Sequence, residues 1–209
     1  MKVIFKKEWE KFYSDGKIPW NVPCAQEELI DILNMYRINS GTVLDIGCGT
    51  GSLCIELSKH KFKVTGVDIS STAIQLAKNK SDSQKVNFKV GDIFKKPLNK
   101  KFDLVVDTGC FHHNFNIDFV DVVAQHLSSK GLWYSAIGSN EGRAPFDLST
   151  IPQVPPAFSL QDITKTVIPY FDVILIRTLN GGSVGDVVLN NNEDGSHFPF
   201  WSCLMRRKT

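Results

Sequence analysis

Asp45 and three glycines at alternating positions, Gly47, Gly49 and Gly51, form the stretch of the sequence with the clearest chemical meaning. This stretch follows an apolar run at 43–44 and precedes a helix-like pattern, an order typical of a strand, a tight turn and a helix N-terminus. Glycine permits a positive φ and a close approach of the backbone to a ligand. A helix N-terminus offers unpaired N–H groups to a negative group, either a carboxylate or a phosphate. The turn is therefore a candidate ligand-binding site.

Two cofactor classes bind at turns of this kind. A dinucleotide fingerprint, Gly-x-Gly-x-x-Gly, requires its third glycine at the position of Ser52. The observed spacing instead resembles motif I of the class I S-adenosylmethionine-dependent methyltransferases, (Asp/Glu)-x-Gly-x-Gly-x-Gly. A dehydrogenase that binds NAD and a glycine-rich turn without a ligand are the alternatives to this resemblance.

Acidic residues lie at or near the ends of the next three predicted strands. The second strand ends at Asp68, 17 residues beyond Gly51, where a carboxylate can accept hydrogen bonds from both ribose hydroxyls. The third strand carries Asp92 close to its end, and the fourth strand ends at Asp107. The methyltransferase resemblance implies that Asp92 lies near the adenine amino group and that the fourth strand opens onto the active site.

The same resemblance covers roughly residues 25–207 and implies a single α/β domain over residues 25–209. The implied fold is a Rossmann-like, doubly wound seven-stranded sheet in the order 3-2-1-4-5-7-6, with the last strand antiparallel. In such a sheet the ligand lies at the carboxyl ends of strands one and four, where the topology switches. A long loop at 138–158 is interpreted as a substrate lid, and residues 180–197 as a flexible extension. The strands predicted after the glycine turn are 63–68, 86–93, 102–107, 132–137, 173–178 and 198–205.

The N-terminal segment, residues 1–24, is predicted to form a cap over this site. Residues 3–13 have the pattern of a short amphipathic helix. The spacing of Trp9, Tyr13 and Trp20 resembles that in the cap of thiopurine, thiol and halide/thiocyanate methyltransferases, with Tyr13 in place of the usual Trp. The resemblance implies that these rings close over the cofactor, and aromatic faces attract a sulfonium cation. The alternative is that they only pack the segment onto the core. The full set of residues implied to bind S-adenosylmethionine is Trp9, Tyr13, Trp20, Asp45, Gly47, Cys48, Gly49, Gly51, Asp68, Ile69, Asp92, Ile93, Asp107 and Thr108.

The exit from the fourth strand, residues 108–113, is where this fold normally holds the methyl acceptor. His112 and His113 are the candidate catalytic residues, as a general base or as acceptor ligands, because the unperturbed pKa of histidine is about 6.5. A purely structural role for both is the alternative. The exit lacks the Asn/Asp-Pro-Pro-Tyr sequence that grips an amide or a flipped adenine. No third ligand is suitably spaced for a metal site with the two histidines, so no metal is predicted.

Composition limits the possible partners and compartment. A net charge of +2 gives little affinity for nucleic acid or an anionic membrane. The five cysteines form no Cys-x-x-Cys pair, which favours a reducing cytoplasm over a disulfide framework. No signal-peptide pattern opens the sequence, and no apolar run reaches the roughly 18 residues of a membrane span.

The predicted reaction is methyl transfer from S-adenosylmethionine to a small-molecule acceptor, a soft nucleophile such as a thiol, a chalcogen or a halide. In-line transfer depends mainly on positioning and on the exclusion of water, so a general base is not required. The alternatives are a methyltransferase acting on another small molecule or on a macromolecule, and a non-catalytic S-adenosylmethionine-binding protein. The oligomeric state is not predicted.

Overall fold

A seven-stranded sheet is the centre of the computed structural model, which describes residues 6–16, 23–80, 85–141, 156–179 and 199–209. The strand order is β3-β2-β1-β4-β5-β7-β6. Strands β1 to β5 are parallel to one another, whereas β7 is antiparallel to both β5 and β6. This topology confirms the predicted fold. The strands are β1 (Gly41–Ile46), β2 (Phe62–Asp68), β3 (Asn87–Val90), β4 (Phe102–Asp107), β5 (Leu127–Gly138), β6 (Phe171–Leu179) and β7 (Phe200–Arg207).

Strands β5 and β3 differ most in length from the apolar pattern. Strand β5 begins at Leu127 rather than at 132. Leu127 is buried in the core, but the exposed Ser129 and Lys130 that follow it interrupt the apolar pattern, and the register against β4 is irregular there. Strand β3 is shorter than predicted and ends at Val90. It lies at the sheet edge and pairs only with β2, and a turn follows it.

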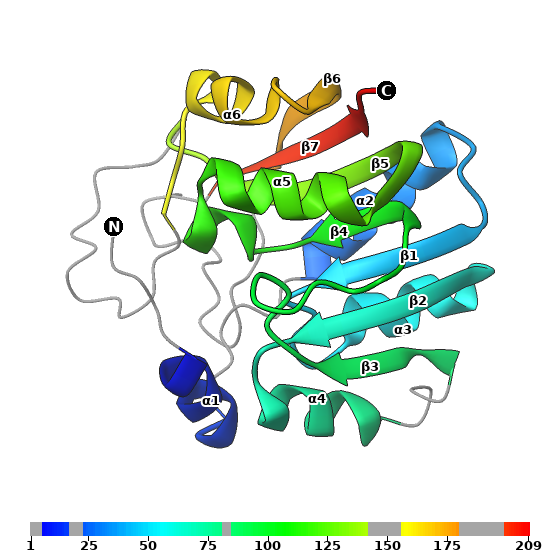
Figure 1. The fold of residues 1–209 in the computed structure, drawn as a ribbon, viewed down its shortest axis with the longest axis vertical. Coiled ribbons are helices and arrows are strands. Elements are labelled where there is room, and N and C mark those ends of the chain that lie inside the picture. The colour runs from blue at the N-terminus through cyan, green and yellow to red at the C-terminus, as the bar shows by residue number, and fades with distance from the viewer. Residues whose placement is uncertain (1–5, 17–22, 81–84, 142–155, 180–198) are drawn as a thin grey trace, which may run out of the picture.

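Helices cover both faces of the sheet (Figure 1). Side chains of α2, α3 and α4 pack on one face, and side chains of α5 and α6 pack on the other. Helix α1 lies beside α4 at the carboxyl edge of β1, β2 and β3, and the 3-10 helix η2 follows β4 at the same edge (Figure 1). The helices are α1 (Lys6–Ser14), α2 (Pro23–Met35), α3 (Ser52–Lys59), α4 (Ser71–Lys78), η2 (Phe111–Asn114), α5 (Ile117–His126) and α6 (Leu160–Val167).

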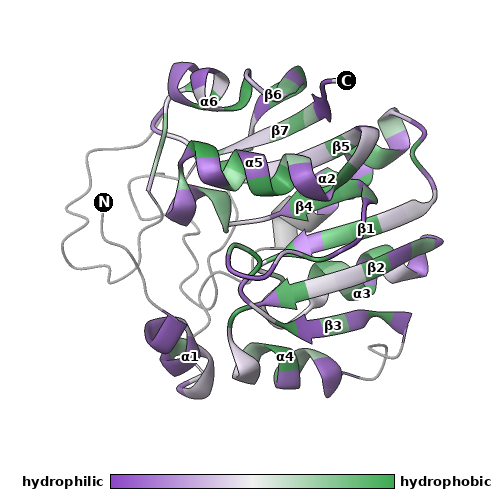
Figure 2. Ribbon diagram, in the orientation of Figure 1, coloured by the Kyte–Doolittle hydropathy of each residue, from purple (hydrophilic) through white to green (hydrophobic). Residues whose placement is uncertain are grey.

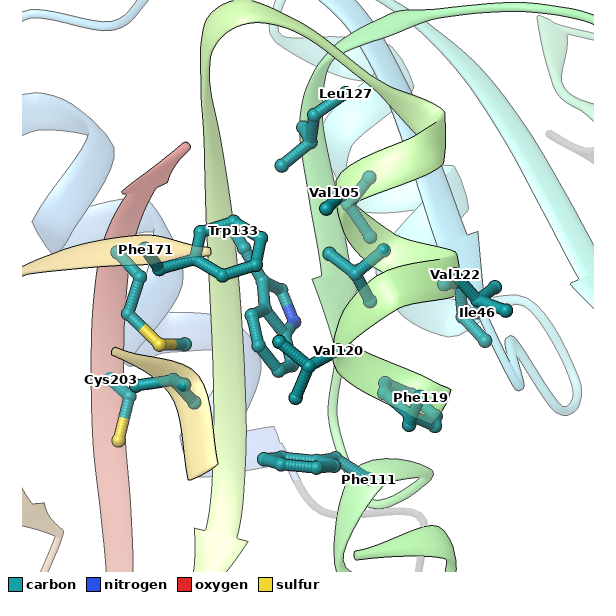
Figure 3. Packing of buried hydrophobic residues seen from close by; sticks show 14 of the residues in the cluster. Ile46, Val105, Phe111, Phe119, Val120, Val122, Leu127, Trp133, Phe171 and Cys203 are labelled. Carbon is teal, nitrogen blue, oxygen red and sulfur yellow. The ribbon is translucent and has the colours of Figure 1, made fainter. Parts of the chain in front are cut away.

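The core consists of two apolar clusters separated by the sheet. Apolar residues are concentrated in the central strands, while α1 is mostly hydrophilic (Figure 2). Trp133 of β5 is fully buried in the first cluster, close to Val120 of α5 and to Phe111 of η2 (Figure 3). The Trp133 and Phe111 ring centroids lie 5.0 Å apart. The segment that leaves β4 is therefore packed directly onto the core.

An ion pair joins α2 to the antiparallel end of the sheet. Nε and Nη2 of Arg177 donate to the two carboxylate oxygens of Glu28, at 2.6 and 2.8 Å, and the Ser202 hydroxyl donates to the same carboxylate at 2.8 Å. An ion pair and hydrogen bonds of this kind offset the free-energy cost of burying a carboxylate. None of the helices in the described part of the chain has the length and apolar character required to cross a membrane.

Candidate functional site at the carboxyl edge of the sheet

The glycine turn connects β1 to α3 and needs glycine for conformational and steric reasons. Gly47, Gly49 and Gly51 have φ values of 71°, 52° and 74°, which L-residues with a side chain rarely adopt. A Cβ at Gly51 would lie 2.4 Å from Cζ of Phe88, so no side chain fits there. The N–H groups of Gly47 and Cys48 donate to the carbonyl of Val67, at 2.8 and 3.1 Å, which fixes the turn against the end of β2.

Asp68 lies at the end of β2, as predicted, and its carboxylate contacts the glycine turn. The N–H of Gly49 donates to one oxygen at 2.9 Å, and the N–H of Ser70 donates to the other at 2.8 Å. Burial raises the pKa of Asp68, and the two backbone hydrogen bonds oppose this rise. Each oxygen retains acceptor capacity, since an ionised carboxylate has about four lone-pair sites.

Asp45 is buried beneath the same turn. Its carboxylate accepts a hydrogen bond from Sγ of Cys54 at 3.1 Å. Burial raises the pKa of Asp45 to about 7, the Cys54 hydrogen bond opposes the rise, and the negative charges of Asp107 and Asp68 add to it. The turn thus has three buried carboxylates around it, a surplus of negative charge that a cation would relieve.

Asp107 is the third of these carboxylates, and protein groups occupy both of its oxygens. The N–H groups of Cys110 and Phe111 donate to Oδ1 at 3.2 and 2.8 Å, and Nε1 of Trp133 donates to Oδ2 at 3.0 Å. These hydrogen bonds therefore shape the β4 exit. Trp133 is a site-forming residue that the sequence analysis did not identify, because an aromatic residue inside an apolar strand pattern carries no signal of its polar partner.

Helix α1 places two of the three predicted cap aromatics near this edge. Tyr13 is 6% exposed, and its hydroxyl would lie 2.8 Å from a Cβ at Gly49, so it packs directly on the glycine turn. The Trp9 ring lies edge-on to the His113 ring, with centroids 5.1 Å apart. Trp20 lies outside the described residues.

Glu10 of α1 was missed by the sequence analysis. Its carboxylate accepts hydrogen bonds from the backbone N–H groups of Ser71 and Thr72, at 2.9 and 3.1 Å, and from both of their hydroxyls. A glutamate in a polar amphipathic helix resembles any solvated surface residue, so only the tertiary contact reveals it.

His112 and His113 lie together on η2, and both are neutral at pH 7. Burial and the neighbouring His113 hold the pKa of His112 well below its usual range, and burial lowers the pKa of His113 to about 4. Their ring centroids are 4.5 Å apart. Nδ1 of His112 is buried and has no hydrogen-bond partner in the described structure.

The remaining predicted residues line the same edge with different exposure. Asp92 accepts hydrogen bonds from the backbone N–H groups of Phe94 and Lys95, at 3.1 and 3.3 Å, and so stabilises the turn after β3. Ile93 is buried in the core, Thr108 is exposed, and Ile69 is half-buried. Within the described ranges, no group of three or more His, Cys, Asp or Glu side chains is placed to hold a metal ion.

The predicted substrate lid begins and ends at the same edge. The N–H of Phe158 donates to the carbonyl of Gly138 at 2.9 Å, and the N–H of Asn140 donates to the carbonyl of Phe158 at 3.2 Å. The Phe158 ring stacks on Phe115, with centroids 3.7 Å apart. The middle of the lid, 142–155, and the whole 180–197 extension lie outside the described residues.

The donor set fits a cationic cofactor. S-adenosylmethionine carries a sulfonium and an ammonium group, and it also has ribose hydroxyls that donate to a carboxylate. Asp45 and Asp68 are buried carboxylates beside glycines whose backbone has no room for side chains. Opposite charge nearby favours the ionised form of a buried acid. A cation bound here would therefore lower the raised pKa of Asp45.

Comparison with known proteins gives the family of the central segment. Residues 39–132 match a family model described as a methyltransferase domain. This segment is therefore similar to a methyltransferase domain. It contains the glycine turn and the ends of β2, β3 and β4. The ubiquinone biosynthesis O-methyltransferase of Coxiella burnetii is 36% identical over 93 residues, which cover 40% of this chain and 39% of that protein. The chain thus spans about two fifths of the length of the first curated relatives it matches.

Solved structures share the fold of the whole chain. One, from work on the conversion of a disulfide bond into a thioacetal group during echinomycin biosynthesis, has a TM-score of 0.74 at 21% identity and covers 98% of this chain and 93% of its own. The 1,6-didemethyltoxoflavin-N1-methyltransferase of Burkholderia thailandensis, with bound substrate and S-adenosylhomocysteine, has a TM-score of 0.72 at 18% identity, with coverages of 98% and 87%. At these identities the two structures support the fold of the chain.

Proposed function

We propose that this protein transfers the methyl group of S-adenosylmethionine to a small molecule whose acceptor atom is a soft nucleophile, a thiol, a chalcogen or a halide. The observation that carries the acceptor class is the state of the two histidines at the β4 exit. Both are neutral, and the pKa of His113 is lowered to about 4. Because His113 is so weak a base, the site suits an acceptor that reacts without transferring a proton to the protein.

The free-energy cost of transferring a proton to this histidine differs between the acceptor classes. A thiol has a pKa of about 8.5, so moving its proton to a base of pKa about 4 costs about 6 kcal/mol at about 1.36 kcal/mol per pKa unit. An aliphatic alcohol is a far weaker acid, so its deprotonation costs much more. A thiolate formed in solution, or a halide or chalcogen anion, needs no such transfer. The acceptor therefore supplies its own negative charge or lone pair.

We assign the cofactor contacts from the position of each group. When bound, S-adenosylmethionine supplies an electrophilic methyl group on sulfur. Asp68 holds the ribose hydroxyls with the acceptor capacity left beside its two backbone donors. Asp45 and the glycine turn, including Cys48, receive the positively charged methionine part. Asp92 and Ile93 lie at the adenine end, with Ile69 between the two regions, and Asp107 and Thr108 shape the approach to the acceptor.

Residues 1–24 act as a separate cap on the domain at 25–209. Support comes from α1, whose Tyr13 packs on Gly49 and whose Trp9 contacts His113. Aromatic faces beside a sulfonium attract its charge and exclude water from the transfer. Trp20 completes the aromatic set in this proposal.

A hydroxyl acceptor is the second candidate. It is supported by the name of the Coxiella relative, an O-methyltransferase. A phenol that ionises in solution would meet the same requirement as a thiolate. The weak base counts against acceptors that must be deprotonated in the site.

A cytoplasmic location is part of the proposal. Of the cysteines whose side chains the structure describes, Cys48, Cys54, Cys110 and Cys203 are all free thiols, which suits a reducing compartment. The net charge of +2 supports a small-molecule acceptor over nucleic acid.

The test is an acceptor panel read out as S-adenosylhomocysteine formation. It contains small thiols, halides, tellurite, phenols, and bulk tRNA and protein. We expect turnover with the soft nucleophiles, and for the thiols a rate that rises with pH through the pKa of the thiol, about 8.5. Turnover confined to phenols would favour the second candidate, and turnover only on macromolecules would refute the acceptor class. Tight cofactor binding with no turnover on any acceptor would indicate a non-catalytic binding protein.

A further inference from the structure

Two of the residues through which helix α1 contacts the rest of the fold, Glu10 and Tyr13, lie one turn apart. Residues three positions apart lie on the same side of an α-helix. Tyr13 packs on Gly49, and Glu10 contacts the N-terminus of α4. The same helix face therefore carries both the ring over the glycine turn and the carboxylate that binds α4.

The Glu10 carboxylate completes the N-terminal cap of α4. The local cap is Ser70, whose hydroxyl accepts from the N–H of Ala73 at 3.0 Å. The first N–H groups of α4, at Ser71 and Thr72, donate instead to Glu10, more than 60 residues away in sequence. The Thr72 hydroxyl adds a bond of 2.5 Å. A carboxylate at this place is also attracted by the helix dipole.

The anchoring point is three residues from a proposed cofactor ligand. Asp68 accepts from the N–H of Ser70, and Glu10 accepts from the next residue, Ser71. The turn after β2 is thus hydrogen-bonded both to Asp68 and to Glu10 of α1.

We infer that Glu10 is a positioning residue that docks α1 on the N-terminus of α4 and so places Tyr13 and Trp9 over the cofactor site. This inference deepens the proposed function and rests on it for the affinity readout alone. The hydrogen bonds to Thr72 and Ser71 hold the pKa of Glu10 at about 2, with the Thr72 hydroxyl as the largest cause. The docking is therefore constant across physiological pH and is set by contacts rather than by titration.

The experiment compares Glu10→Ala, Glu10→Gln and the control Asp15→Asn in the 209-residue chain. Asp15 is an exposed acid that follows the same helix. Hydrogen exchange is measured without cofactor, and S-adenosylhomocysteine affinity is measured by calorimetry. For Glu10→Ala we expect faster exchange limited to residues 6–14 and the first turn of α4. We also expect about tenfold weaker binding of S-adenosylhomocysteine, because α1 is docked on α4 in a smaller fraction of the molecules. Glu10→Gln retains one acceptor oxygen and should fall between Ala and wild type.

The outcomes separate this inference from the proposed function. Wild-type exchange of 6–14 in Glu10→Ala refutes the docking role whatever the cofactor does. Faster exchange there with unchanged affinity refutes the placement of the aromatic residues over the cofactor. A wild-type protein that does not bind S-adenosylhomocysteine refutes the proposed function and the placement of the aromatic rings together, while the exchange result still decides the docking. Faster exchange spread over the whole sheet would show general destabilisation and also count against the inference. Asp15→Asn should match wild type in both measurements.

Discussion

Gly51 is the position where a single added methyl group should have the largest effect on the site. Its φ of 74° is unfavourable for alanine by about 1–2 kcal/mol. The new Cβ would also lie 2.4 Å from Cζ and 2.7 Å from Cε1 of Phe88, and 3.0 Å from Cβ of Ala77. Phe88 is buried between helices and sheet, so its ring cannot move without disturbing neighbours. Overpacking of this kind adds about 1–3 kcal/mol.

Gly51→Ala should therefore lower the free energy of unfolding by about 2–5 kcal/mol, which for about 200 residues lowers Tm by about 4–20 °C. The matched control is Gly16→Ala. Gly16 has a similar φ of 68°, but no atom lies within 4 Å of its added Cβ, so only the backbone cost applies. That cost is about 1–2 kcal/mol. Urea denaturation followed by circular dichroism measures both variants.

The difference in unfolding free energy between Gly51→Ala and Gly16→Ala gives the steric contribution of the contact with Phe88. If Gly51→Ala is no less stable than Gly16→Ala, then the contact with Phe88 has no energetic consequence and the reasoning is wrong. A second check is Gly51→Ala in a Phe88→Leu background. Removing the ring should recover about 1 kcal/mol of the Gly51→Ala cost, as expected for residues in contact.

Two further predictions concern the carboxylates of the site. Asp68→Asn should weaken S-adenosylhomocysteine binding by about 10- to 150-fold, since charge-assisted hydrogen bonds contribute about 1.5–3 kcal/mol; calorimetry with unchanged affinity in a folded variant would contradict the ribose assignment. The pKa of Asp45 is raised to about 7 from an unfolded value of 3.8. Between these two pH values the native state binds more protons than the unfolded state. The stability that Asp45 contributes is therefore lost as pH rises through about 7. Without cofactor, the unfolding free energy of wild type relative to Asp45→Asn should fall by about 2–4 kcal/mol from pH 4 to pH 8; a pH-independent difference would mean that Asp45 has an ordinary pKa.

The order of the elements and the position of the ligand edge were predictable from the sequence. Apolar runs that end in glycine or an acid identify parallel strands, because such strands are buried on both faces and carry polar groups only where they end. The same logic placed Asp45 and Asp68 at one edge of the sheet. Strand ends were less predictable: polar residues at 128–130 separate the buried start of β5 at Leu127 from its apolar pattern, and β3 at the sheet edge ends early at Val90.

Tertiary structure alone determined the contacts between segments distant in sequence. Glu10 binds Ser71 and Thr72, and Trp133 binds Asp107, yet neither pair shares a local pattern, because hydrogen bonds across the fold depend on how elements pack. The neutral state of His112 and His113 also follows from burial, which sequence spacing does not report. Local propensity and periodicity act within a segment, and burial and electrostatics depend on what surrounds it. The sequence therefore determined which residues reach the ligand edge, and the packing determined their charge and their partners.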